Sequence, residues 1–306
     1  MGESQARMTK KISILAATGL FAAALAFGLQ RAGGGRETSP FNQQRVAQDL
    51  QAIVGFGPRP AGSDAIGKTR AYIVSELQKA GLKPQLDEFD ARTPRGVKHM
   101  VNIRASRAGS KPSIIAVTGH YDTKLFDDIR FVGANDGGSS AAWLLEFARC
   151  TRDLKLESTL EFVFFDGEEA VVEWTDEDSV YGSRHDVDRR LRNKNLTDVK
   201  AMILVDMIGD RNLNIKREGQ STRWLKDIIW STAQSIGYAK EFPNDEIEVS
   251  DDHIPFLRAG VPAVDLIDFD YPAWHSAADT LDKVDARSLK IVGDVVYFSL
   301  PLIDRR

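Results

Sequence analysis

Four continuous apolar runs, each ending abruptly in polar residues, constrain the fold of this chain more than any other feature of its sequence. Each run is short and rich in β-branched or aromatic residues. Runs of this kind, separated by helical patterns, indicate strands that are buried on both faces of a largely parallel sheet. The four runs are Ser113–Thr118, Thr159–Phe165, Ala201–Val205 and Ala263–Ile267.

Helical patterns precede the runs and lie between them. Apolar residues at helical spacing predict helices in 41–55, 66–81, 139–150, 223–237 and 289–302. Strands alternating with helices predict an α/β fold of three layers, in which a mostly parallel central sheet is flanked by helices. In open sheets of this class the ligand site lies beyond the carboxyl ends of the strands. The polar residues that end the runs are therefore the place to look for a site.

The N-terminal segment is predicted to lie outside this domain. Lys10 and Lys11 precede an apolar stretch, Ile12–Leu29, and a glycine linker, Gly33–Gly35, follows it. This pattern is typical of an export signal or a membrane anchor, and Ala24–Ala26 offers a small-x-small cleavage site. We expect residues 1–35 to be a signal peptide or anchor with its linker, and 36–306 to be one α/β domain of an exported protein, periplasmic, secreted or membrane-anchored.

Composition excludes some classes of function. The chain has 42% hydrophobic and 27% charged residues, enough apolar material for a sizeable core. Its formal net charge of -4 gives no long-range attraction for phosphate backbones, so nucleic acid is not an expected partner. Cys150 is the sole cysteine, which rules out an intrachain disulfide, and its place at the end of a helical pattern predicts a buried structural thiol.

The polar residues at the strand ends have the chemistry of a metal site. Zinc takes imidazole and carboxylate ligands, and a catalytic zinc keeps three protein ligands and one open position. Two adjacent glutamates, Glu168 and Glu169, can divide the roles of proton carrier and ligand. The sequence does not choose among the candidates, which are His120, Asp122, Asp136, Glu168, Glu169, Asp206, Asp251, Asp252 and His275.

Each fragment taken alone also has an ordinary structural interpretation. His120 and Asp122 could form only a local hydrogen bond, although the same pair is a usual device for orienting a ligand. Asp252 could merely cap a short helix. His99 and His185 are expected to be structural or exposed.

Six segments together resemble the animal-type glutaminyl cyclases, a family built on the fold of the co-catalytic zinc aminopeptidases. The resemblance extends from about Phe41 to the C-terminus. It rests on Gly119–Lys124, Phe131–Asp136, Phe164–Ala170 with Trp174, Asp178–His185, Asp251–Leu257 and Trp274–His275.

The resemblance implies a function and a set of site residues. A glutaminyl-peptide cyclotransferase closes the N-terminal glutamine of a peptide to pyroglutamate and releases ammonia. One Zn²⁺ per chain is expected on Asp136, Glu169 and His275, with Glu168 as general acid and base. Asp206 and Asp251 would form a hydrogen-bonded carboxylate pair beside it. His120 matches a position that holds a second metal in the related peptidases.

The resemblance also implies a substrate pocket, formed by Trp174, Tyr271, Trp274 and Met207. Here the sequence departs from the family, because Tyr271 stands where phenylalanine is usual and Met207 where leucine is usual. Ser250 replaces a glutamine. These changes affect the expected polarity of the pocket and leave the ligands intact.

Two other functions remain open at this point. A zinc aminopeptidase of the same fold would use His120, Asp136, Glu168, Glu169, Asp206 and His275, all of which are present. A non-catalytic binding module on a degenerate fold would be expected to have lost Glu168 or a ligand. Trp174, Trp274 and the Asp251–His253 motif favour the cyclase, acting on N-terminal glutamine peptides and expected to be a monomer.

Overall fold

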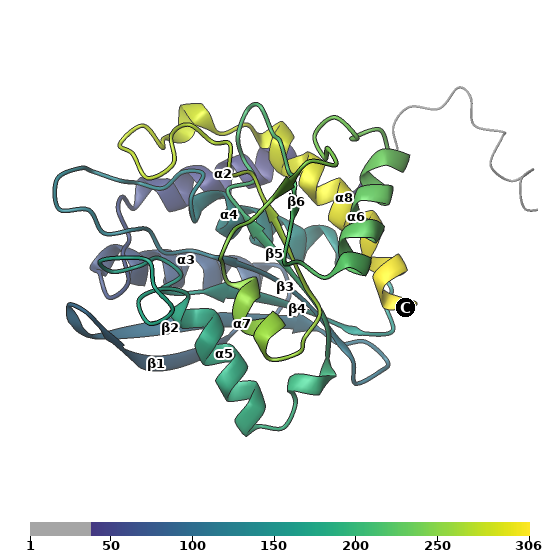
Figure 1. The fold of residues 1–306 in the computed structure, drawn as a ribbon, viewed down its shortest axis with the longest axis horizontal. Coiled ribbons are helices and arrows are strands. Elements are labelled where there is room, and N and C mark those ends of the chain that lie inside the picture. Colours follow the sequence, from purple (N-terminus) through teal and green to yellow (C-terminus); the bar gives the residue numbers. More distant parts are fainter. Residues whose placement is uncertain (1–37) are drawn as a thin grey trace, which may run out of the picture. The chain divides into compact units, whose positions relative to one another are not determined.

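The four apolar runs form four adjacent parallel strands in the computed structural model, which describes residues 38–306. They belong to a six-stranded sheet with the order β1-β2-β4-β3-β5-β8 (Figure 1). The strands are β1 (Gln85–Thr93), β2 (Gly96–Arg107), β3 (Ile114–His120), β4 (Thr159–Phe165), β5 (Val199–Asp206) and β8 (Ala263–Ile267), and a separate small sheet pairs β6 (Arg217–Glu218) with β7 (Glu246–Ile247).

One edge of the main sheet is antiparallel. β1 and β2 form a hairpin, and β2 pairs antiparallel with β4. A polar strand pattern around Val101–Ala105 predicts part of β2. No pattern predicts β1, because this edge strand buries little beyond Ala91. The prediction of a mostly parallel sheet is nevertheless confirmed for the part that carries the site.

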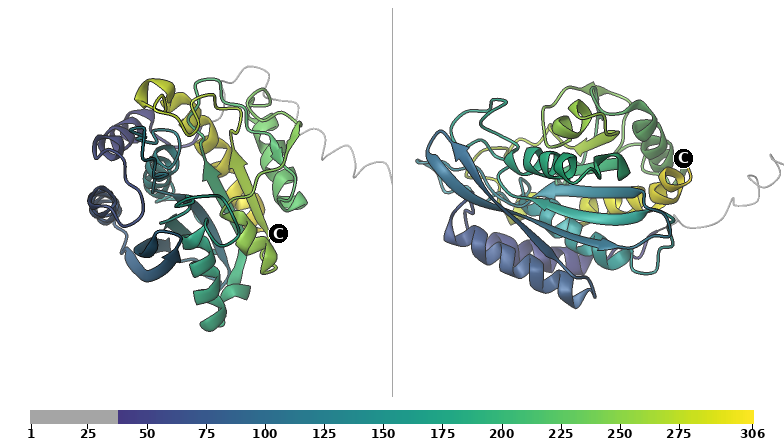
Figure 2. Two further views of the ribbon diagram at one scale, coloured as in Figure 1. Left: turned by 60° about the vertical axis from the view of Figure 1, so that its left-hand side comes forward. Right: turned by 90° about the horizontal axis from the view of Figure 1, so that it is seen from below.

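Helices cover both faces of the sheet, as the two views in Figure 2 show. Side chains alternate along each strand, so Ala201, Ile203 and Val205 of β5 enter the larger core cluster, whereas Met202 and Leu204 enter the smaller one. Helices α2, α3, α4, α6 and α8 contribute to the larger cluster, and α5 and α7 to the smaller. The helices are α2 (Gln43–Gly55), α3 (Asp64–Lys79), α4 (Gly138–Cys150), α5 (Tyr181–Arg192), α6 (Arg223–Ser235), α7 (His253–Arg258) and α8 (Ala286–Asp304).

The register of the strands brings their polar ends together. His120 ends β3 opposite Phe165, the last residue of β4, and Asp206 ends β5 opposite Ile267, the last residue of β8. Because these strands run parallel, the residues that follow them emerge at one edge of the sheet. His120 and Asp206 therefore lie at the carboxyl edge of the sheet, where the sequence predicted the candidate residues to gather.

The other structural expectations have mixed status. Cys150 is buried, and burial raises the pKa of its thiol, so it is a structural residue. The predicted export segment, residues 1–35, lies outside the described residues. Within residues 38–306, none of the helices combines the length and the apolar character needed to cross a membrane.

Candidate metal centre and active site

Five side chains meet at the carboxyl edge of the sheet and form two overlapping groups that share one member. In each group the potential ligand atoms lie within 4.8 Å of one another. We call His120, Asp136 and Asp206 the inner group, and Asp136, Glu169 and His275 the outer group. Asp136 belongs to both, because it sits on the loop between β3 and α4, between the two histidines. The outer group is the ligand set that the family resemblance implied.

The outer group lies on loops. Nε2 of His275 is 3.2 Å from Oε1 of Glu169 and 3.4 Å from Oδ2 of Asp136. His275 has a positive φ of 50°, a strained conformation for a residue with a Cβ, which is common where the surrounding structure fixes a functional side chain. The edges of Phe126 and Phe131 contact its ring at 5.7 and 5.8 Å between centroids. These contacts hold the imidazole toward the carboxylates.

The inner group lies at the strand ends and is almost fully buried. Nε2 of His120 is 3.1 Å from Oδ1 of Asp206 and 3.3 Å from Oδ1 of Asp136. Nδ1 of His120 hydrogen bonds Asp122, as the pair in the sequence predicted. The carboxylate of Asp122 also accepts the backbone N–H groups of Glu168 and Glu169 at 3.1 and 3.3 Å. Asp122 therefore fixes the histidine and the Glu-Glu segment together.

One close approach explains the glycine at the start of α4. Gly137 has a φ of 74°, and a Cβ there would collide with the carbonyl oxygen of Asp122. This packing sets the loop of Asp136 directly against the loop of Asp122. Any larger residue at position 137 would separate the two loops.

The electrostatics are those of a site that needs a cation. Burial, and then the charges of neighbouring carboxylates, raise the pKa of Glu168 well above its ordinary value and that of Glu169 to about 7. Burial alone would lower the pKa of His275, but hydrogen bonding to Asp136 and Glu169 outweighs it and raises the pKa to about 9. The same bonds to His120 and His275 overcome burial at Asp136 and lower its pKa.

The residues present fit a metal ion. Oε2 of Glu169 is buried without a hydrogen-bond partner, and Oδ2 of Asp136, also buried, has only the 3.4 Å contact with Nε2 of His275. Buried carboxylate oxygens without a partner are costly unless a cation or water satisfies them. Together with the imidazole of His275 they form the histidine and carboxylate donor set that zinc uses. The structure therefore supports a metal at the outer group.

More carboxylates lie behind Glu168. The charges of Asp251 and Asp252 raise the pKa of Glu168, and Asp251 is itself buried, with Oδ2 unpartnered and its pKa raised by burial and by Asp206. Asp206 accepts from His120, and no hydrogen bond joins it to Asp251 within residues 38–306. Asp206 and Asp251 therefore influence each other through their charges. The hydrogen bond between them remains a prediction. Asp252 precedes α7, but its side chain makes no capping hydrogen bond.

The predicted pocket residues occupy three different settings. Trp274 is 43% exposed and stacks on the His275 ring with 4.2 Å between ring centroids. It also contacts the ring of Phe269, at 4.8 Å between centroids. Trp174 is also exposed, on the loop after Glu169, and no described ring contact joins it to the histidines. Tyr271 and Met207 are buried together in a small apolar cluster. The two tryptophans are therefore not core residues, the alternative that a tryptophan near a strand end always carries.

Sequence reasoning missed the residues that hold this site in place. Asp178 accepts three successive N–H groups, of Val171, Val172 and Glu173, and so shapes the loop that carries Trp174. Arg59 and Asp279 hold the loop of Asp136. The resemblance includes Asp178 without giving it a role, and no local pattern marks the roles of these residues, because each acts on a segment distant in sequence or on backbone atoms alone.

The histidines that were expected to be structural are outside the site. His185 stacks on Phe89 at 4.0 Å and lies 3.2 Å from Asp87. His99 is exposed beside Asp90. Neither approaches the two metal groups.

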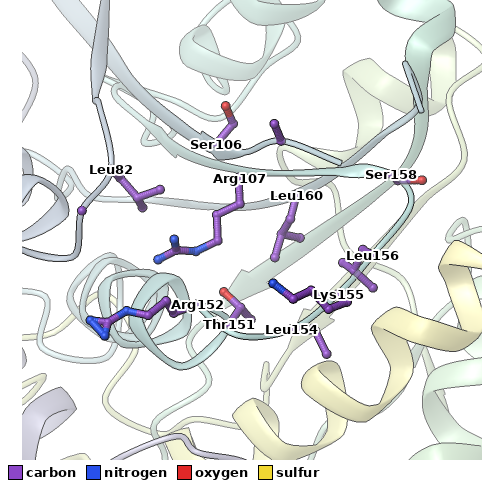
Figure 3. A pocket seen from close by; sticks show the side chains of 12 residues that line it. Leu82, Ser106, Arg107, Thr151, Arg152, Leu154, Lys155, Leu156, Ser158 and Leu160 are labelled. Atoms are coloured by element: carbon purple, nitrogen blue, oxygen red, sulfur yellow. The ribbon is translucent and has the colours of Figure 1, made fainter. Parts of the chain in front are cut away.

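A cavity lies away from the candidate metal centre, at the opposite ends of the strands. Its volume is about 320 Å³, and Ser158 and Leu160 at the start of β4 and Arg107 at the end of β2 line it (Figure 3). Its lining contains no histidine or carboxylate. Arg107 donates to the carbonyl oxygens of Ala80 and Ala148, where α3 and α4 end. Its positive charge therefore has a structural role at two helix C-termini.

Comparisons with known proteins agree with the geometry. A model of peptidase family M28 matches residues 102–299. The glutaminyl-peptide cyclotransferase of Boiga irregularis is 31% identical over 300 residues, covering 85% of this chain and 81% of that protein. The crystal structure of a glutaminyl cyclase from an Acidobacteriales bacterium is similar with a TM-score of 0.83 and 36% identity, covering 90% of this chain and 99% of that one. A Zn-dependent exopeptidase from Parabacteroides distasonis has a TM-score of 0.79 and 26% identity, covering 88% and 100%.

Proposed function

We infer that this chain, which belongs to peptidase family M28 and to the glutaminyl-peptide cyclotransferases within it, converts N-terminal glutamine of peptides to pyroglutamate and releases ammonia. One observation in the site carries this assignment. The exposed ring of Trp274 stacks on His275, so an aromatic wall stands beside the outer metal group. A wall of this kind suits a pocket that admits one flexible side chain and restricts water.

The reaction joins two ends of the same residue. The nitrogen of the free α-amine attacks the γ-carbonyl carbon of glutamine, the bond from that carbon to the amide nitrogen breaks, and ammonia leaves. One proton must move from the attacking nitrogen to the departing nitrogen. No water takes part, so the protein has to position the substrate and carry that proton.

Glu168 is the proposed proton carrier. It is 5% exposed, and it lies beside the metal groups without belonging to either. Its raised pKa suits a group that accepts a proton from the amine and returns it to the leaving nitrogen. Asp251 supports this role because its charge raises the pKa of Glu168, and Asp206 in turn raises the pKa of Asp251.

A metal on the outer group is part of the proposal, with Zn²⁺ as its identity and one ion per chain as its stoichiometry. Asp136, Glu169 and His275 would hold it and leave one position open. The chemistry that a bound Zn²⁺ supplies is polarisation of the γ-carbonyl and stabilisation of the negative charge on its oxygen. Trp274, Trp174 and the buried pair of Tyr271 and Met207 would shape the space around the substrate.

The inner group favours a second candidate function, a zinc aminopeptidase. His120, Asp136 and Asp206 lie as close together as the outer ligands do, and a shared Asp136 suits two metal ions. Such an enzyme would cleave the first peptide bond with an activated water. The two activities release different products, so they can be separated directly.

The deciding experiment combines two substrates with a metal count. Purified protein with zinc is given a glutamine-initiated dipeptide and a leucine-initiated dipeptide. We expect ammonia from the first, no free leucine from the second, and one zinc per chain. Glu168→Gln protein is the control for contaminating enzymes. Efficient leucine release with two zinc ions per chain would establish the aminopeptidase instead.

We further propose that residues 1–35 export the protein and that 36–306 forms a single catalytic domain. Expression of 36–306 alone should give soluble protein with the cyclisation rate of the full chain. Fractionation of cells expressing the full chain should place the activity outside the cytoplasm. Retention in the cytoplasm, or an unfolded truncation, would contradict this division.

A further inference from the structure

The loop that carries Asp136 is held from two sides by side chains that no sequence motif connects. Oδ1 of Asp136 faces His120 at 3.3 Å, and Oδ2 faces His275 at 3.4 Å. This one carboxylate therefore sets the separation of the inner and outer groups. Its orientation depends on the backbone that carries it, residues 132–136.

Arg59 holds the carbonyl side of this loop. Its guanidinium donates from Nη1 to the carbonyl of Val132 at 2.6 Å, and from Nη2 to Gly133 at 2.8 Å and Asp136 at 3.4 Å. Nε donates to the carbonyl of Tyr121, beside His120. Arg59 is fully buried, and within the described residues it forms no ion pair with a carboxylate. A buried arginine is usually paired with an acidic side chain. Here the guanidinium donates to backbone carbonyls instead, which indicates that its role is to hold the loop.

Asp279 holds the amide side of the same loop. Its carboxylate accepts the N–H groups of Asn135 at 2.8 Å and Asp136 at 3.1 Å, and its carbonyl accepts the N–H of Ala134 at 3.3 Å. The hydroxyl of Tyr271 donates to Asp279 at 2.7 Å and fixes the carboxylate in turn. The loop is thus clamped between a cation on its carbonyls and an anion on its amides.

The backbone conformation leaves little room for an alternative position. Gly133 has a φ of 52°, and a Cβ there would collide with the carbonyl oxygen of Asp136. The loop is therefore folded back on itself within the clamp. Without Arg59 or Asp279, several buried backbone groups would lose their partners, and the loop would move to find others.

We propose that Arg59 and Asp279 are positioning residues that hold Asp136 between His120 and His275, and that Tyr271 acts through Asp279. This inference rests on the proposed metal site. Partners that orient a ligand commonly contribute 10- to 100-fold, in round figures, to metal affinity. The proposal also gives Tyr271 a role beyond that of a pocket wall, through the hydroxyl that phenylalanine lacks.

A purely structural role is the competing explanation for a buried arginine, and the chain contains a matched control. Arg190 is 1% exposed and bonds Asp186 and Glu161 near α5, away from the metal groups. Loss of its fork should lower stability without affecting the metal. Loss of the fork of Arg59 should affect both.

The test measures zinc affinity by competition with a chelator, and thermal unfolding of the metal-free protein, in Arg59→Lys, Asp279→Asn, Tyr271→Phe and Arg190→Lys. We expect zinc to bind about 10- to 100-fold more weakly in Arg59→Lys and Asp279→Asn. Tyr271→Phe should weaken zinc binding by a few fold. Arg190→Lys should unfold at a lower temperature than the wild type and keep the wild-type affinity for zinc.

The outcomes separate this inference from the proposed function. Wild-type affinity in folded Arg59→Lys and Asp279→Asn would overturn the clamp. If Arg59→Lys fails to fold, Asp279→Asn and Tyr271→Phe decide the question. Wild-type protein that binds no zinc would instead overturn the proposed metal site. A larger KM with unchanged zinc affinity in Tyr271→Phe would make Tyr271 a pocket residue alone.

Discussion

The inner and outer groups share Asp136 but are built in different ways. The inner histidine, His120, ends a central strand, and its side chain is 1% exposed. The outer histidine, His275, lies on a loop with a positive φ, and its side chain is 21% exposed. His120 is surrounded by carboxylates, whereas His275 contacts three aromatic rings as well as two carboxylates.

This difference separates the two tasks that the site has to perform. The inner region gathers buried carboxylates around Glu168, which is an environment for moving a proton. The outer region presents an aromatic face and unpartnered carboxylate oxygens, which is an environment for a metal and a substrate side chain. Asp136 links the two regions, so variants on either side should affect different measurable properties.

The largest effect should come from exchanging one glutamate of the Glu-Glu pair. Glu168→Gln removes the proton carrier and leaves the outer ligands intact, so turnover should fall roughly 1000-fold while zinc stays bound. Glu169→Gln should reduce turnover and zinc affinity together, because it replaces a ligand. Steady-state kinetics with metal analysis of the purified variants checks both.

The paired result is what gives this prediction its force. If zinc is lost from Glu168→Gln, the residue is a ligand and the division between the two regions is wrong. A near-normal rate in the same variant would move the proton transfer to another group, and Asp251, whose charge raises the pKa of Glu168, would be the next candidate.

The second prediction compares the two histidines directly. His275→Ala should weaken zinc binding by about 100-fold or more, because a ligand is removed. His120→Ala should leave zinc affinity within a few fold if the metal is held by the outer group alone. His185→Ala is the control for loss of an imidazole outside the site. Equal loss of zinc in both variants would place the ion between the groups, and loss of one ion of two in each would favour the aminopeptidase.

The sequence predicted the architecture of the site better than its surroundings. The apolar runs ending at His120 and Asp206 located the strand ends, because burial on both faces requires continuous apolar residues. The edge strand β1 escaped notice because its exposed residues, such as Asp87 and Asp90, weaken the apolar pattern. Helix α5 was missed for a similar reason, since it is rich in charged residues.

Arg59 shows where sequence reasoning reaches its limit. It lies in a loop rich in glycine and proline, a setting that predicts an exposed turn. Its burial comes from packing against residues 121–136, and its partners are backbone carbonyls that carry no sequence signature. The sequence does not predict the exposure of Trp274 either, because an aromatic residue near a strand end can pack inward or face solvent.

The third prediction concerns the stability of the metal-free protein as a function of pH. Glu169 has its pKa raised to about 7, so the stability it contributes is full below about 4.5 and is lost as the pH rises through 7. His275, with a pKa raised to about 9, loses its contribution as the pH rises from about 6.5 through 9. The melting temperature should therefore fall from pH 5 to pH 9, by about 5 °C.

Variants should divide this pH profile into its parts. Glu169→Gln should remove the lower part of the decline, and His275→Ala the upper part. Zinc-saturated protein should show a smaller decline, because the metal offsets the negative charge that develops. A flat profile in the metal-free wild type, measured by thermal unfolding, would show that the pKa values of Glu169 and His275 are not raised in the folded protein.

The smallest effects should come from the two exposed tryptophans, and they should be unequal. Trp274 stacks on His275, so Trp274→Ala removes both a pocket wall and a contact that orients a ligand. Aromatic stacking contributes about 0.5–1.5 kcal/mol, which predicts a loss of up to about tenfold in kcat/KM for glutamine peptides. Trp174 makes no described ring contact with the histidines, so Trp174→Ala should act only through the substrate, with a loss of a few fold carried mainly by KM.

Because both side chains are exposed, neither change should lower the melting temperature by more than a degree or two. Kinetics on glutamine dipeptides, with zinc content measured in parallel, would separate the two residues. Equal losses, both carried by kcat, would mean that Trp174 also contacts the reacting centre once the substrate is bound.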